Sequence, residues 1–514
     1  MQPRRTRARE VRIDATDLAY LRPHPEHVSN GDELRYRIGG DLSYIGNYTK
    51  GLPHDALGHA DPSAYRAMVR ALTSGQPPDF ELIPMGAPVG NRRKFISPQA
   101  GLAFDLEGSD AHSLPIPPAP RIDSAEIAAE MAELYWMALV RDVAFEDYPA
   151  NATVAQAMAS MNTFSDFRGP KDPANNVTVD TLFRGITPGD LTGPYISQFL
   201  WLPVTFGTIP FTQRQRTAQS NIDYLISFPD WLAVQDGNPA GPDAFDLFRR
   251  YIRNLRDLAT YVHFDALYEA YLNACLILLG LGAPFDPGNP YRDTVTQDGF
   301  ATFGGPHILS LVTEVATRAL KAVWFQKWYV HRRLRPEAFA GLVHNQVTGA
   351  FNYNALHPEI LNTAAGSVLE AVNNFNTGNG HDTYLLPMAF PEGSPLHPAY
   401  GAGHATVAGA CATILKAWFD ESWVIPNPVI PTPGGFFLIP YVGPDLTVGG
   451  ELNKVAANIA IGRNAAGVHW RTDYTESIKL GEQVAISVLQ EQKLCFNESS
   501  SLSLTKFDGT SITI

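Results

Sequence analysis

The stretch HPAYGAGHATVAGACATILKAWF, residues 397–419, joins a glycine-rich turn to a strongly periodic run. Val407, Cys411 and Trp418 recur at the spacing of one buried helix face. His404 stands where the turn ends, and the glycines before it let the backbone approach a ligand closely. Free N–H groups at the start of a helix favour an anion. The stretch therefore predicts a buried helix with an anion site at its mouth, and a plain glycine turn with a capping histidine is the alternative.

Helical periodicity continues on both sides of this stretch and indicates a mainly α protein. The segment 123–145 opens with Asp123 and places Glu126 three residues later, which is a capping-box pattern. Further helical patterns cover residues 245–282 (as two helices ending at Gly280–Gly282), 308–333, 451–462 and 471–492. We therefore expect helix bundles joined by long connections.

Strand signals are few. The tail SLSLTKFDGTSITI, residues 501–514, alternates and carries Asp508–Gly509, which predicts a small C-terminal β hairpin. We expect a loop-rich and proline-rich N-terminal wrap over residues 1–120, a helical-bundle catalytic region over 121–495, and a hairpin tail over 496–514. No repeat or linker separates these parts, so we expect one structural domain overall.

Composition limits the classes of partner. The chain of 514 residues is 45% hydrophobic and 18% charged, the profile of a globular protein with a sizeable core. Its net charge of −13 argues against nucleic acid as a partner. No apolar run reaches the roughly 18 residues of a membrane helix. The start, MQPRRTRAREVRIDA, is basic with no apolar segment after it, so we expect no secretory signal, no membrane contact and, by default, a cytoplasmic protein.

The three cysteines, Cys275, Cys411 and Cys495, fit neither a zinc site nor a redox pair by their spacing. The first two lie in apolar helical runs, so we expect buried free thiols. Cys495 follows the last predicted helix and is the one placed to pair between subunits.

A cluster of basic side chains forms a second feature. Pro336 breaks the helix directly after it. The cluster spans nine residues and comprises Lys327, His331, Arg332, Arg333 and Arg335. A solvated basic helix end, favoured by the helix dipole, is the ordinary explanation for such a run taken alone.

A third feature is the segment from Arg463 to Asp473. Arg463 ends one predicted helix and His469 begins the next, with Asp473 four residues later on the same helix face. Alone, this is an ordinary helix–helix corner. The three features together provide a lysine, arginines, two histidines and a helix start, which is an oxyanion cradle. Two chemistries use such a cradle: phosphoryl transfer through a phosphohistidine, and permanent binding of vanadate with histidine on the metal.

The order and spacing of these motifs resemble the vanadium-dependent haloperoxidases, most closely the algal and cyanobacterial bromoperoxidase type. In that type the lysine precedes the Arg-Pro arginine by eight positions, as Lys327 precedes Arg335, whereas acid phosphatases and fungal chloroperoxidases use seven. The segments KWYVHRRLRPE and SPLHPAYGAGHATVAGACATILKAWF also resemble this type. The resemblance covers most of residues 120–500 and implies a fold of haloperoxidase and acid-phosphatase type.

The resemblance assigns roles to particular residues. It implies that the ring nitrogen of His469 binds vanadium and that His404 is the acid–base histidine. It implies that Lys327 polarises the oxidant and that His397 is the second histidine of the bromoperoxidases, which we count with the catalytic residues. The expected vanadate-binding set is Lys327, Arg335, Gly403, Arg463 and His469.

One position departs from the family pattern. The family usually reads Pro-Ser-Gly-His, and its serine hydroxyl binds a vanadate oxygen, whereas this chain has Ala402. A hydrogen bond to a charged group contributes roughly 1.5–3 kcal/mol. We therefore expect weaker vanadate binding, unless a water or a neighbouring side chain replaces the hydroxyl.

The function implied by the resemblance is vanadate-dependent oxidation of bromide, and of iodide, by hydrogen peroxide to hypohalite, which then halogenates small organic compounds. The resemblance also implies a homo-oligomer, from a dimer up to a dodecamer. An acid phosphatase using the same cradle, with His469 as nucleophile, is the first alternative. A non-catalytic oxyanion-binding protein is the second, and Ala402 is its only support.

Overall fold

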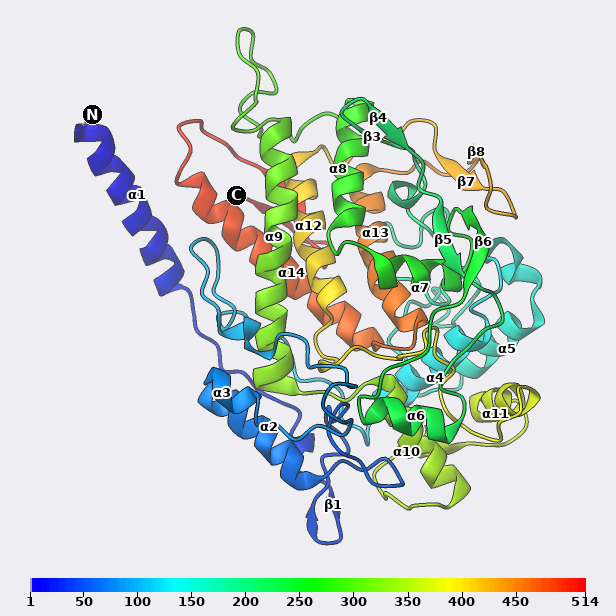
Figure 1. Cartoon of the computed structure of the whole chain (residues 1–514). Helices are drawn as coiled ribbons and strands as arrows, with labels where there is room; N and C mark the ends of the chain where they lie inside the picture. The colour runs from blue at the N-terminus through cyan, green and yellow to red at the C-terminus, as the bar shows by residue number, and fades with distance from the viewer. Residues whose placement is uncertain (1) are drawn as a thin grey trace.

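The computed structural model of the chain describes residues 2–514 and is mainly helical, as expected (Figure 1). The α-helices are α1 (Gln2–Leu21), α2 (Pro62–Ser74), α3 (Pro77–Phe80), α4 (Ala125–Leu139), α5 (Ala152–Met161), α6 (Phe228–Gln235), α7 (Leu255–Phe264), α8 (Glu269–Leu281), α9 (Gly305–Phe325), α10 (Pro336–Thr348), α11 (Val368–Gly378), α12 (Gly403–Trp418), α13 (Val448–Ala465) and α14 (Arg471–Lys493). Short turns are η1 (Asp32–Leu34), η2 (Pro98–Leu102), η3 (Phe145–Ala150), η4 (Gln198–Leu200), η5 (Gln326–His331) and η6 (Pro358–Leu361).

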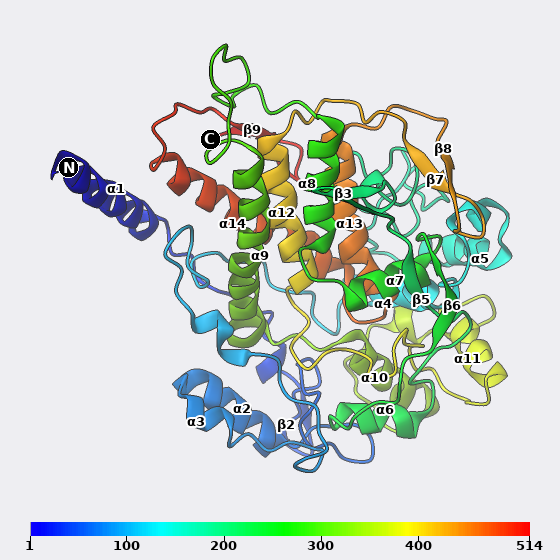
Figure 2. The same cartoon turned by 45° about the horizontal axis from the view of Figure 1, so that its top comes forward.

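Helix α12, the helix of the opening stretch, forms the centre of the molecule. It packs against α9, α13 and α14, and the four helices lie side by side in two views (Figures 1 and 2). Every residue of α12 except His404 is buried. Burial on all sides explains its composition, because a central helix has no polar face to present to water.

Glycines set the close packing of α12 on α14. A Cβ atom added at Gly409 would lie 2.0 Å from the carbonyl oxygen of Ile478. One added at Gly481 would lie 1.9 Å from the carbonyl oxygen of Thr406. The two backbones therefore approach each other more closely than any side chain permits, which holds the start of α12 in a fixed place beside the start of α14.

The strands form five separate antiparallel pairs in the described part of the chain. The pairs are β1 (Arg37–Ile38) with β2 (Asp41–Leu42), β3 (Val204–Phe206) with β4 (Ile209–Phe211), β5 (Gln215–Ala218) with β6 (Phe245–Arg250), β7 (Val429–Pro431) with β8 (Leu438–Pro440), and β9 (Ser503–Thr505) with β10 (Ser511–Thr513). The β9–β10 pair confirms the predicted C-terminal hairpin. It turns at Asp508–Gly509, with Gly509 at a φ of 83°.

Three helix predictions need correction. Residues 245–250, expected to be helical, form β6, because β5 supplies a strand partner that local periodicity does not reveal. The α9 helix stops at Phe325 and continues as the π-helical turn η5, after which Arg332 takes a φ of 41° and ends the helical run before residue 333. The cap of α4 is Ser124, whose Oγ accepts from the Ile127 N–H, while Asp123 pairs with Arg121 instead.

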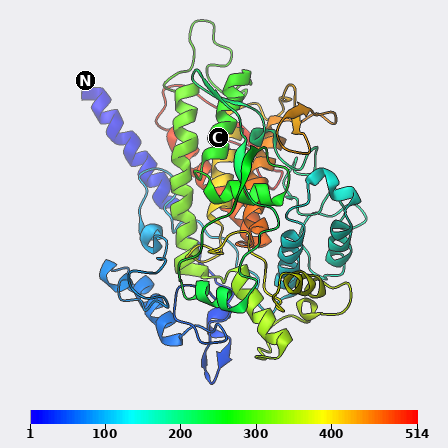
Figure 3. The ribbon, with the colours of Figure 1, turned by 45° about the vertical axis from the view of Figure 1, so that its right-hand side comes forward.

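The N-terminal region carries a helix that periodicity does not predict. Helix α1 projects away from the body of the molecule, as the turned view shows (Figure 3). Most of its residues are polar or charged, and the narrow stripe of Val11, Ala15 and Leu18 is too weak a signal to indicate a helix. Helix α2, by contrast, packs Tyr65 and Met68 into a small core with Trp328 of η5.

Cys275 and Cys411 are buried free thiols, as expected, and Cys495 is a free, exposed thiol. Within residues 2–514, no single helix has the length and apolar character to cross a membrane. The bent pair of α7 and α8, which meet at 99°, passes that test of length and composition together.

Candidate active site

The predicted site residues converge from five separate segments. Gly403 and His404 begin α12, and His397 lies in the loop before it. Lys327 lies in η5, and Arg335 is the N-cap of α10. Arg463 lies in the last turn of α13, and His469 lies in the turn between α13 and α14. The structure brings all of them together at one end of the central bundle.

Arg335 connects the two histidine segments. Its guanidinium donates to the carbonyl oxygens of His397 and Val468, at 3.0 and 2.6 Å. It also lies 3.0 Å from His469 Nε2 and 2.9 Å from His397 Nδ1. Arg335 is an obligate donor, so His469 Nε2 accepts, whereas His397 Nδ1 lies between this donor and the Pro398 carbonyl oxygen, at 3.1 Å, and its role depends on the tautomer. Burial lowers the pKa of Arg335 to about 10.

Lys327 and Arg463 add two further buried cations. Lys327 Nζ donates to the carbonyl oxygens of Pro398 and Ala399, at 2.8 and 3.0 Å. Burial, helped by the positive charge of Arg335, holds the pKa of Lys327 well below its usual range. Burial also lowers the pKa of Arg463, against the opposing carboxylates of Asp265 and Glu392. A bound anion would reverse these shifts, because it stabilises the charged forms.

A carboxylate fixes the ring of His469. Its Nδ1 lies 2.7 Å from Asp473 Oδ2, so the Nδ1 proton is donated to the carboxylate and Nε2 carries the lone pair that Arg335 meets at 3.0 Å. Burial, together with the positive charge of Arg335, keeps the pKa of His469 well below its usual range. Asp473 is itself held by Arg333, at 2.8 Å. The predicted pairing of His469 with Asp473 is present, but His469 does not begin the helix: it precedes Trp470, the N-cap of α14, and Asp473 lies in the first turn of that helix.

His404 has a partner that the sequence did not indicate. Its Nε2 lies 3.0 Å from Oδ1 of Asp265, the residue that follows α7. Burial lowers the pKa of His404, and Asp265 opposes that shift. The histidine is therefore neutral at neutral pH and is bonded to a group that would stabilise its protonated form.

His397 lies between a cation and an aromatic wall. Its Nδ1 lies 2.9 Å from the Arg335 guanidinium and 3.1 Å from the Pro398 carbonyl oxygen, and its ring centroid lies 4.9 Å from that of Trp324. A Cβ atom at Gly403 would meet the same Trp324 ring at 3.1 Å. Glycine at this position therefore leaves the start of α12 open beside the indole. Burial, with the charges of Lys327 and Arg335, holds the pKa of His397 well below its usual range.

Several of these groups line a cavity of about 240 Å³, and Lys327 and Arg335 lie behind its lining. Its lining includes Trp324, His397, Gly403, His404, Arg463 and His469. Ala402 is the N-cap of α12 and provides no side-chain cap, so the N–H groups of the first turn stay free. The Nε of Arg463 is buried without a hydrogen-bond partner among residues 2–514. Unpaired donors, buried cations and a neutral imidazole fit an oxyanion whose central atom takes a histidine ligand.

The other basic residues of the 327–335 run serve different purposes. Arg332 pairs with Glu33, and Arg333 pairs with Glu130 and Asp473. Both ring nitrogens of His331 are buried and have no hydrogen-bond partner among residues 2–514. The explanation of this run as a solvated helix end is therefore wrong, because Arg333 forms buried ion pairs, Arg332 forms a partly buried one and Arg335 faces the site.

Comparisons with known proteins agree with this geometry. A family model described as the second helical-bundle domain of VCPO matches residues 308–498. A vanadium-dependent bromoperoxidase from Corallina officinalis is 42% identical over 100% of this chain and 99% of its own length. The chain belongs to the vanadium-dependent bromoperoxidases. Another such enzyme, from Ascophyllum nodosum, is 37% identical over 91% of this chain and 86% of its own length.

The fold of this bromoperoxidase is also that of a solved structure. The homohexameric second vanadate-dependent bromoperoxidase from Ascophyllum nodosum superposes with a TM-score of 0.94 at 31% identity. The match covers 99% of this chain and 90% of the other. The predicted family and fold class are thereby confirmed.

Reasoning from sequence missed Asp265 and Trp324, and also His263 and Glu392, which line the same cavity. Asp265 lies 139 positions before His404, and its neighbours carry no motif. Trp324 precedes Lys327 by three residues, so helical spacing could have placed it on the same side of the run.

Proposed function

We propose that this protein oxidises bromide with hydrogen peroxide, using bound vanadate, and so halogenates small organic compounds. The observation that carries the proposal is the buried His469, whose Nδ1 is bonded to Asp473 and whose Nε2 faces a set of cations. Vanadate supplies, when bound, a Lewis-acidic centre that activates peroxide towards a halide. Iodide, which is easier to oxidise than bromide, is a second expected substrate.

The proposed vanadate-binding groups follow from the donor set. His469 Nε2 is the metal ligand, because it is the buried imidazole nitrogen whose ring is fixed by a carboxylate on the other side. Lys327, Arg335 and Arg463 offset the negative charge of the oxyanion. The free N–H of Gly403 at the start of α12 adds a backbone donor.

His404 is the proposed base. With its Nε2 proton donated to Asp265, its Nδ1 lone pair is free to take a proton from hydrogen peroxide. Asp265 then stabilises the imidazolium that forms, as the carboxylate does in other histidine–carboxylate pairs. His404 thus holds the proton until it is returned to the departing product.

Lys327 and His397 have supporting roles in the proposal. Lys327 is fully buried, so its charge acts in a region of low dielectric constant and polarises the oxidant strongly. His397 lies 2.9 Å from Arg335 and packs against Trp324 in the lining of the cavity. Bromide over chloride rests on the resemblance to the bromoperoxidases, and His397 is the feature that this chain shares with them.

A direct assay separates this proposal from its alternatives. The purified protein is tested for bromide oxidation and for phosphate-ester hydrolysis, each with and without added vanadate. We expect bromide oxidation that requires vanadate and is lost, with vanadium retention, in His469→Ala. Phosphatase activity that vanadate inhibits, with no bromide oxidation, would instead identify an acid phosphatase.

We also propose a homo-oligomer, from a dimer up to a dodecamer. The solved relative from Ascophyllum nodosum is homohexameric. Helix α1 projects from the body with Tyr20 and Leu21 exposed at 78% and 75%, an arrangement suited to contact with a second copy. Light scattering that detects only a 56.2 kDa particle would refute this part of the proposal.

A further inference from the structure

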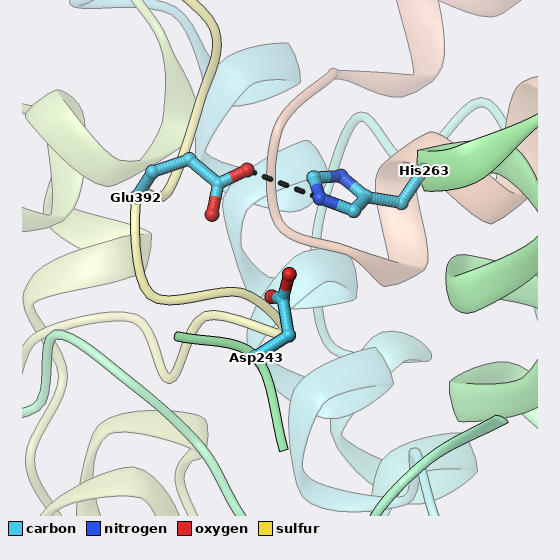
Figure 4. Close-up of side chains that lie close together, drawn as sticks. All are labelled: Asp243, His263 and Glu392. Carbon is cyan, nitrogen blue, oxygen red and sulfur yellow. Dashed lines mark ion pairs between the residues drawn. The ribbon is translucent and has the colours of Figure 1, made fainter. Parts of the chain in front are cut away.

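Two carboxylates and an imidazole meet at the edge of the active-site cavity (Figure 4). Asp243 comes from the loop between α6 and β6, His263 from the last turn of α7, and Glu392 from the loop before α12. One ligand atom from each side chain lies within 4.8 Å of the other two. Three segments that are distant in sequence therefore direct metal-binding atoms at one point.

The three side chains of the cluster do not fully satisfy one another's hydrogen-bonding capacity. His263 Nε2 lies 3.1 Å from Glu392 Oε1, and the His263 ring stacks on Phe390 at 3.8 Å. Asp243 has no such partner: its Oδ1 is buried and makes no hydrogen bond within residues 2–514. Burial, and then the nearby Glu392 carboxylate, raise the pKa of Asp243. A cation placed between the three side chains would remove this repulsion.

We propose that Asp243, His263 and Glu392 bind a divalent cation of the Zn²⁺ class. One imidazole with two carboxylates suits Zn²⁺, which takes nitrogen and oxygen ligands at about 2.0–2.2 Å. Bonds of that length hold two ligand atoms at most about 4.4 Å apart, so small side-chain movements close the site. The His263–Glu392 hydrogen bond is replaced by two bonds to the metal.

The position of the site connects it to the active-site cavity. His263 and Glu392 line the same cavity as His404 and Arg463. When no cation is bound, the two carboxylates of the cluster lie beside the cavity that a halide must enter, and their negative charges repel an anion. A bound divalent cation cancels both charges. We therefore expect the occupied site to favour halide entry, and this consequence, unlike metal binding itself, rests on the proposed bromide oxidation.

The binding test uses the full-length, vanadate-loaded protein, so that the histidines of the cavity are already engaged. Calorimetric titration with Zn²⁺ follows removal of metals by a chelator and of the chelator by dialysis. We expect one tight site per chain, weakened in Asp243→Asn, His263→Gln and Glu392→Gln by at least the roughly 10–100-fold that loss of a supporting residue costs. Asp246→Asn, on the same segment but paired with Arg250, is the matched control and retains the site.

Zn²⁺ binding that is absent from the wild type, or unchanged in all three variants, would overturn the proposal. Circular dichroism of the metal-free variants shows whether each has folded. A zinc-soaked crystal of the wild type provides a test without any variant, because its anomalous peak must lie between these three side chains. A peak elsewhere would leave Glu392 and His263 as a simple ion pair.

The halide consequence has its own measurement. We expect Zn²⁺ to lower the KM for bromide of the wild type with little change in kcat, and to leave the KM of Asp243→Asn unaltered. Tight Zn²⁺ binding without a change in the KM for bromide would overturn the halide role. The metal would then only link loop 236–244 to the catalytic bundle. A protein that binds Zn²⁺ but oxidises no bromide would refute the proposed function and not the metal site.

Discussion

Replacing Ala402 with serine restores the hydroxyl that the family pattern contains, and the structure gives two distinct places for it. Ala402 is the N-cap of α12, with φ and ψ of −84° and 126°, and it makes no side-chain cap. The first hydrogen bond of the helix runs from the Thr406 N–H to the Ala402 carbonyl, so the N–H groups of residues 403–405 have no acceptor within the helix. A serine hydroxyl at this position either caps those groups or donates to a bound oxyanion.

The two outcomes differ in size and in what they change. A hydroxyl that donates to charged vanadate contributes about 1.5–3 kcal/mol, which tightens vanadate binding by about 10- to 150-fold. A hydroxyl that caps α12 instead stabilises the vanadate-free protein by about 0.5–2 kcal/mol and competes with the anion for the same N–H groups. We expect the first outcome, because the buried cations of the cavity attract the oxyanion to the mouth of the helix.

The assay is titration of the vanadate-free protein with vanadate, followed by recovery of bromide oxidation. Ala402→Cys is the control, because its thiol is similar in shape but a weak donor. We expect the serine variant to bind vanadate more tightly than both the wild type and the cysteine variant. Equal or weaker binding, together with a raised melting temperature, would show that the hydroxyl caps the helix, and the reasoning would be wrong.

Four further predictions follow from the same geometry. His404→Ala should retain vanadate but slow turnover by about 10²–10⁴-fold, the usual contribution of general acid–base catalysis; turnover within a few-fold of wild type across pH 5 to 8 would remove His404 from the mechanism. Asp265→Asn should lower the pKa of His404, because the Asp265 carboxylate raises that pKa. Since His404 must be neutral to accept a proton, the acid limb of the pH–rate profile should then move to lower pH. A shift of the acid limb to higher pH would contradict the pairing. His469→Ala should abolish retention of vanadium, measured by elemental analysis after gel filtration, whereas normal retention would mean that another group is the ligand. Gly481→Ala should destabilise the fold by about 1–3 kcal/mol in urea unfolding, because its Cβ would meet the Thr406 carbonyl at 1.9 Å, while Gly378→Ala, with open space around it, should not.

Much of the site could be predicted from the sequence because its parts are local. Lys327 and Arg335, His397 to His404, and Arg463 to His469 each lie within one short segment at a helix end. Helix ends are marked by glycine, proline and changes in periodicity, which are properties of neighbouring residues. The pairing of His469 with Asp473 was predictable for the same reason, since only four positions separate them, although His469 lies before α14 and not within it.

Local sequence periodicity failed to predict two elements, strand β6 and helix α1. Residues 245–250 form a strand because they pair with β5. The pattern of these six residues alone does not indicate that distant partner. Helix α1 has only a narrow apolar stripe, so periodicity is a weak signal for its twenty residues. In both cases the information lies outside the window in which helical spacing is read.

The sequence by itself determined the central helix, the three motifs of the oxyanion cradle and the family. Tertiary structure alone decided which charges face the cavity. It paired His404 with Asp265, placed Arg333 in buried ion pairs and Arg332 in a partly buried one, and joined Asp243, His263 and Glu392 into one cluster. The physical reason is that periodicity specifies which face of a helix is buried. The partner of a buried charge is instead set by how distant segments pack against each other. The local sequence pattern of one segment contains no information about a segment so far away in the chain.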